Sequence, residues 1–161
     1  MTSRTTVLCC ALLALPTLLS AQASSSGSSS QKLTYAQKLV NDTLAKHKDV
    51  VIMAFHVTPP QQKDNVIIAS NIGRYGKKAD EDDMRVINTG ASNLEVNKTG
   101  NHFEDELPLL DAAGNRIGAV GIVFNYKAGD DKARLAKAAE RVRDEMQKKI
   151  PSREKLFEPT E

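Results

Sequence analysis

The stretch FEDELPLLDAAGNRIGAVGIVFNY, residues 103–126, contains two extended runs joined by a tight turn, and it decides the fold. Asp111-Ala112-Ala113-Gly114 is a turn signal between them. It predicts an antiparallel hairpin with strands at 103–110 and 117–126. We therefore expect the second half of the chain to contribute neighbouring strands to an antiparallel sheet.

Both predicted strands contain residues that are unusual for their positions. Asp105 falls on the face of the first strand that Phe103, Leu107 and Leu109 make apolar. The second strand places the small residues Gly118, Ala119 and Gly121 among larger apolar ones. Glycine inside a strand indicates that another part of the backbone or a ligand comes close to it.

The remaining elements follow from the hydrophobic periodicity on either side of the hairpin. Helices are expected at about 35–47, 80–89 and 131–150, and further strands at 50–57, 66–70 and 94–97. Gly90 and Pro151 are the expected stops of the last two helices. The predicted fold class is α+β: a five-stranded antiparallel sheet with an N-terminal helix, a short middle helix and a long C-terminal helix.

The N-terminus predicts export from the cytoplasm. Residues 1–23 place Arg4 before an apolar run at 7–19 and end in Ser20-Ala21-Gln22-Ala23, the order of a signal peptide cleaved after about Ala23. The apolar run is shorter than the roughly 20 residues that span a bilayer. The expected organisation is a signal peptide at 1–23, a Ser/Gly-rich linker at 24–32, a folded domain at 33–150 and a flexible tail at 151–161. The expected location is periplasmic or secreted.

Composition excludes several classes of function. Both cysteines lie in the signal peptide, so the exported chain is expected to have no disulfide and no thiol nucleophile. Of the 22 Lys and Arg residues only Arg4 lies there, so 21 remain against 20 acidic residues. This balance, without a basic stripe, argues against a nucleic-acid partner. No second apolar run is long enough to span a membrane.

Two motifs resemble those of a known family. Ile67-Ile68-Ala69-Ser70-Asn71 leads into Gly73-x-x-Gly76-Lys77, and an acidic short helix follows. The pattern P-L-L-D-x-x-G-x-x-I-G-A-V-G-I occupies residues 108–122. In this order of elements, residues 33–150 resemble the PAS-like single Cache domains, which are extracytoplasmic sensor domains of bacterial receptors.

The resemblance implies a pocket for a small anion or amine, between the sheet and the loop before the strand at 94–97. Cache domains are usually joined to membrane helices and an output domain, and this sequence departs from that pattern. A signalling role would therefore need a separate membrane-bound receptor or transporter as partner.

The loop at 71–83 is the expected ligand site. The predicted ligand-binding residues are Asn71, Arg74, Tyr75 and Lys77 in or beside this loop, with His56 and His102 on strands. The forked guanidinium group of Arg74 suits a carboxylate, and Tyr75 adds a hydroxyl group. The alternative is a solvated turn whose cations pair with the acidic residues at 80–83.

No catalytic residue, metal site or cofactor is predicted. The G-x-S-x-G motif is absent. His56, His102 and Glu104 could be assembled into a metal site, but no spacing enforces it. Glu104 and Glu106 share a strand face, as alternate residues of any amphipathic strand do.

The leading hypothesis is an extracytoplasmic, non-catalytic domain that binds a small anionic or polar molecule. The alternative is an accessory protein that docks a membrane-bound partner through a sheet edge or the C-terminal helix.

Overall fold

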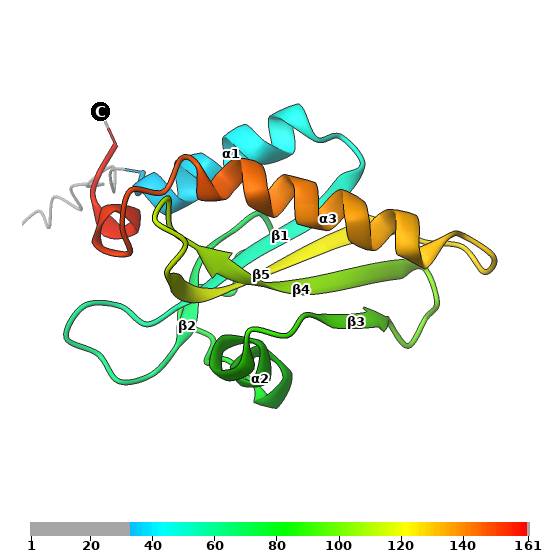
Figure 1. The fold of residues 1–161 in the computed structure, drawn as a ribbon, viewed down its shortest axis with the longest axis horizontal. Coiled ribbons are helices and arrows are strands. Elements are labelled where there is room, and N and C mark those ends of the chain that lie inside the picture. Colours follow the sequence, from blue (N-terminus) through cyan, green and yellow to red (C-terminus); the bar gives the residue numbers. More distant parts are fainter. Residues whose placement is uncertain (1–32, 161) are drawn as a thin grey trace, which may run out of the picture. The chain divides into compact units, whose positions relative to one another are not determined.

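A five-stranded antiparallel sheet forms the centre of the computed structural model, which describes residues 33–160 (Figure 1). Its strands are β1 (Val50–Val57), β2 (Val66–Ser70), β3 (Asn93–Val96), β4 (His102–Leu110) and β5 (Arg116–Asn125). They lie in the order β2-β1-β5-β4-β3. The helices are α1 (Tyr35–Lys46), α2 (Glu81–Thr89) and α3 (Lys132–Gln147), followed by a 3-10 helix, η1 (Glu154–Phe157). The predicted fold class is confirmed.

The two faces of the sheet are covered unequally. Helices α1 and α3 lie together over one face, while α2 alone packs against β4 and β5 on the other (Figure 1). On the face under α1 and α3, alternate strand residues such as Met53, Phe55 and Phe124 are fully buried in the main core. The residues between them, such as Ala54, face α2, which is too short to cover this side completely.

The ends of α2 are fixed by the local sequence. The side chain of Asp80 accepts a hydrogen bond from the N–H of Asp83 at 3.3 Å, and the side chain of Asp83 accepts one from the N–H of Asp80 at 2.8 Å. This reciprocal capping box satisfies amide groups that the first helical turn leaves free. Gly90 ends the helix in the left-handed region, with φ 79°, as its position in the sequence predicts.

The glycines of β5 sit where other groups come close, as their positions in the strand predict. A Cβ atom on Gly118 would lie 2.2 Å from the backbone oxygen of His56 on the neighbouring strand. A Cβ atom on Gly121 would lie 2.6 Å from Oε1 of Glu104. The first glycine therefore accommodates backbone, and the second leaves room for a carboxylate side chain.

The segment after Pro151 differs from the flexible tail that was expected. It forms η1, whose Leu156 is fully buried in the main core. The backbone oxygen of Glu158 accepts a hydrogen bond from the N–H of Tyr35 at 2.8 Å. The charged composition of this segment predicts a flexible tail, but the apolar residue Leu156 anchors it in the core. The folded domain therefore continues to the end of the described residues.

The predicted signal peptide (1–23) and the predicted linker (24–32) both lie outside the described residues, which begin at residue 33. Among residues 33–160, no helix is both long and apolar enough to cross a membrane.

Candidate functional site

A cavity of about 220 Å³ lies on the face of the sheet that carries α2. Residues of all five strands line it, together with α2 and the segment before that helix. Its apolar lining includes Ile52, Ala54, Ile67, Ile72 and Val123. Its ionisable lining consists of the acidic residues Asp80, Asp82, Asp83, Glu95, Glu104 and Glu106 and the basic residues His56, Arg74 and Lys77. The lining is thus dominated by carboxyl groups.

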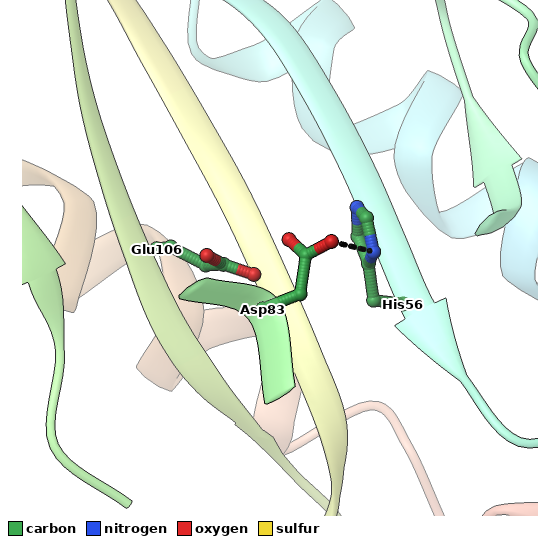
Figure 2. Close-up of side chains that lie close together, drawn as sticks. All are labelled: His56, Asp83 and Glu106. Carbon is green, nitrogen blue, oxygen red and sulfur yellow. Dashed lines mark ion pairs between the residues drawn. The ribbon is translucent and has the colours of Figure 1, made fainter. Parts of the chain in front are cut away.

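Small residues of β5 allow side chains of the two neighbouring strands, β1 and β4, to approach one another. In the sheet register, Glu106 of β4 lies opposite Gly121, and His56 of β1 lies opposite Ala119. Strand β5 runs between the strands that carry His56 and Glu106 (Figure 2). Since neither Gly121 nor Ala119 has a long side chain, His56 and Glu106 can approach one another across it, with α2 packed above.

His56, Asp83 and Glu106 form a buried cluster at this point. Asp83 projects from α2 between the other two side chains (Figure 2). Its Oδ2 atom lies 3.1 Å from Nδ1 of His56, an ion pair when the imidazole is protonated. The exposed fractions are 7% for His56, 7% for Asp83 and 5% for Glu106. A potential ligand atom of each residue lies within 4.8 Å of those of the other two.

The pKa values of the two carboxyl groups of the cluster are shifted in opposite directions. Burial, contact with Asp83 and the charges of Asp83 and Glu104 raise the pKa of Glu106 to about 10, so it is neutral at pH 7. Burial alone would raise the pKa of Asp83. The contacts with His56 and with Glu106, and the N–H of Asp80, outweigh burial and hold that pKa well below its usual range.

Glu104 adds a further carboxyl group beside the cluster. Burial raises its pKa, and so do the negative charges of Glu95 and Asp83, while His56 acts in the opposite direction. A cationic group that entered the cavity would relieve this repulsion, because it would interact favourably with several carboxylates at once.

Two of the basic residues of the cavity, Arg74 and Lys77, come from the loop before α2 and are exposed at its rim. Lys77 is already engaged, with Nζ 3.7 Å from Oδ2 of Asp80. Within the described residues the guanidinium group of Arg74 has no hydrogen bond or ion pair. Arg74 has φ 64°, a left-handed conformation that is uncommon for a residue with a side chain. The loop therefore offers one free cation to the cavity.

The structure brings together three of the six predicted ligand-binding residues: His56, Arg74 and Lys77 line the cavity. The other three lie elsewhere. The Tyr75 hydroxyl donates to Oε1 of Gln37 at 2.8 Å, and the Asn71 side chain bonds to the backbone of β1. His102 lies beside Asn97 and outside the cavity lining. Asn71 thus has a structural role in this conformation.

Sequence reasoning missed the acidic side of the cavity. Asp83 was interpreted only as a partner for loop cations, and Glu106 only as one residue of an amphipathic strand. One signal was present: Glu104 and Glu106 share a face of β4, opposite the face on which Phe103 and Leu107 are buried. Two charged residues on one face of a central strand indicate that this face does not pack against an apolar core, as the opposite face does.

Comparisons with known proteins identify the fold. No protein-family model matches the chain, and neither does any curated protein. The A. aeolicus nlh2 GAF domain in an inactive state aligns with 71% of this chain and 83% of its own, at 14% identity and a TM-score of 0.52. The fold is GAF-like. The Agobacterium tumefaciens repressor BlcR aligns with 73% of this chain and 68% of its own, at 12% identity and a TM-score of 0.51.

These similarities confirm the expected architecture at the level of a PAS/GAF-like domain. The Cache family, which the sequence motifs resemble, is not specifically indicated by them. At such low identity the likeness concerns the fold, and the function has to be argued from the cavity.

Proposed function

We propose that this protein is an extracytoplasmic, non-catalytic domain that binds a small polar molecule carrying a protonated amino group. The observation that supports it best is the cavity on the α2 face, where carboxyl groups outnumber basic side chains. A GAF-like fold shared with the repressor BlcR is consistent with a binding role.

The charge of the lining supports an amine over a simple anion. An anion would have to approach Glu104 and Asp83, whereas an ammonium group gains charge-assisted hydrogen bonds from them. The free guanidinium group of Arg74 at the rim would accommodate a carboxylate on the same ligand. The sequence predicts an anionic ligand for the loop. We propose instead that the ligand carries an anionic group at one end and the protonated amino group at the other.

The size of the cavity limits the ligand. Sites for drug-sized molecules measure roughly 300–1,000 Å³, and this cavity measures about 220 Å³. We therefore propose a ligand of few atoms, in the class of small amines and amino acids.

The proposal is tested by calorimetric titration and thermal-shift measurements with small amines, on protein first treated with EDTA. Glu104→Gln should weaken the best amine by about tenfold or more, because it removes one charge-assisted hydrogen bond worth roughly 1.5–3 kcal/mol. Tyr75→Phe is the matched control, since its hydroxyl bonds to Gln37 outside the cavity, and it should leave affinity unchanged. The absence of any amine binding, or equal binding by Glu104→Gln, would contradict the proposal.

The extracytoplasmic part of the proposal rests on the predicted signal peptide. N-terminal sequencing of the protein recovered from a periplasmic extract should begin at about Ser24. Recovery only from the cytoplasm with Met1 intact would contradict export.

A further inference from the structure

The cluster of His56, Asp83 and Glu106 has a composition that binding of a protonated amine does not require. An imidazole and two carboxyl groups from three different elements converge at one buried point (Figure 2). An ammonium group needs only acceptors, and an imidazole nitrogen beside it adds little. Nitrogen and oxygen donors together are, however, the usual ligands of first-row transition metals.

Two buried atoms of the cluster make no hydrogen bond. Within residues 33–160, Nδ1 of His56 and Oε1 of Glu106 are buried and have no hydrogen bond. The 3.1 Å contact from Nδ1 to Asp83 is close, but it is not aligned as a hydrogen bond. Both residues are more than nine-tenths buried. Buried polar atoms without partners are costly, so each such atom in a folded protein calls for an explanation.

The spacing of the three groups allows one ion to bind all of them. Ligands at about 2.0–2.2 Å from one ion in tetrahedral geometry lie about 3.3–3.6 Å from one another. One candidate atom from each residue lies within 4.8 Å of the others. Side-chain movements of up to roughly 1 Å each would thus close the cluster around an ion.

We propose that His56, Asp83 and Glu106 form a binding site for a divalent transition-metal ion of the Zn²⁺ class. The ion would be held by Nδ1 of His56 and one oxygen from each carboxylate. Three protein ligands leave at least one coordination position free, and because the three residues line the cavity, that position faces it. Asp83 has a second function as a cap of α2, so the ion would also tie that helix to β1 and β4.

The experiment is titration of EDTA-treated protein with Co²⁺, followed by visible absorption, and with Zn²⁺, followed by calorimetry. Saturable 1:1 binding is expected, with the Co²⁺ bands displaced by Zn²⁺. Glu106→Gln, nearly identical in shape, should weaken Zn²⁺ binding by at least about tenfold. Glu95→Gln is the matched control: it removes a carboxylate from the same cavity but outside the cluster, and should change affinity by less than about twofold.

Several outcomes would overturn the proposal. They are the absence of saturable Zn²⁺ binding by the unaltered protein, and equal binding by Glu106→Gln and Glu95→Gln when circular dichroism shows both folded. If Glu106→Gln does not fold, the Co²⁺ spectrum of the unaltered protein decides, because an imidazole–carboxylate site of low coordination number absorbs more strongly than aqueous Co²⁺. The proposed amine ligand is tested without metal, so failure of either proposal leaves the other measurable.

Discussion

Asp105 places a carboxyl group among apolar side chains on the face of the sheet that α1 and α3 cover. It is 1% exposed, and its Oδ1 atom has no hydrogen bond within the described residues. Burial and the negative charge of Glu140 raise its pKa to about 7, while Arg143 partly opposes this shift. The sequence singled out Asp105 as the polar exception of its strand face, but not the two ionisable residues of α3 that surround it.

This raised pKa predicts how stability depends on pH. Between pH 3.8, the pKa of an unperturbed Asp, and about 7, the folded protein binds a proton that the unfolded chain has lost, so Asp105 makes the free energy of unfolding fall as pH rises. Asp105→Asn has no such proton. Its stability relative to the unaltered protein should therefore increase between pH 4 and pH 8 by at least about 1 kcal/mol, since one pKa unit corresponds to about 1.4 kcal/mol.

Urea denaturation at several pH values measures this difference. Asp144→Asn controls for the loss of a negative charge near Arg143, because Asp144 is exposed on α3. A difference between Asp105→Asn and the unaltered protein that stays constant from pH 4 to pH 8 would contradict the prediction, as would an equal trend in Asp144→Asn.

At the scale of an element, β5 carries two glycines that tolerate different changes. Gly118→Ala would place a Cβ atom 2.2 Å from a backbone oxygen of β1, which cannot move without disturbing the sheet. Gly121→Ala would meet only the flexible end of Glu104, at 2.6 Å. We expect Gly118→Ala to lower the free energy of unfolding by about 2 kcal/mol or more, and Gly121→Ala by less than about 1 kcal/mol.

Each variant serves as the control for the other, since both add one methyl group to the same strand. Thermal or urea unfolding gives the two stabilities. Gly121→Ala should in addition weaken ligand binding, because it displaces Glu104 in the cavity lining. Equal stabilities, or a larger loss in Gly121→Ala, would mean that the close backbone approach at Gly118 is relieved at little cost.

Elements were predicted well wherever the signal was local. The turn at 111–114 and the stop of α2 at Gly90 each depend on neighbours within a few positions of the sequence. The cluster depends instead on the strand order, which places β5 between β1 and β4. Residues 56, 83 and 106 are brought together by pairings that no single segment encodes, so only the basic half of the cavity could be predicted.

At the scale of the whole described domain, the same unequal covering of the sheet explains stability and function together. The face under α1 and α3 is filled by apolar side chains and supplies the core. The α2 face keeps ionisable groups around a cavity, which costs stability wherever those groups are unpaired. A ligand or ion that satisfied them would stabilise the folded state by mass action.

The two ends of the described chain are also hydrogen-bonded to one another, and this pairing predicts that η1 contributes to the stability of the domain. The N–H of Thr160 donates to the backbone oxygen of Leu33 at 2.7 Å, and Thr34 pairs with Pro159. Leu156 fills the core beside α1. Leu156→Ala should therefore cost about 2–5 kcal/mol of unfolding free energy, the range for removing a buried leucine side chain.

Hydrogen exchange distinguishes a local from a global effect of this variant. Because Glu158, the residue after η1, accepts the hydrogen bond from the N–H of Tyr35, exchange should accelerate first in the amides at the start of α1. Glu154→Ala alters an exposed residue of the same helix, and should leave stability nearly unchanged, because exposed ion pairs contribute little. If Leu156→Ala behaved like Glu154→Ala, the segment after Pro151 would be the dispensable tail that its composition resembles, and the domain would end at α3.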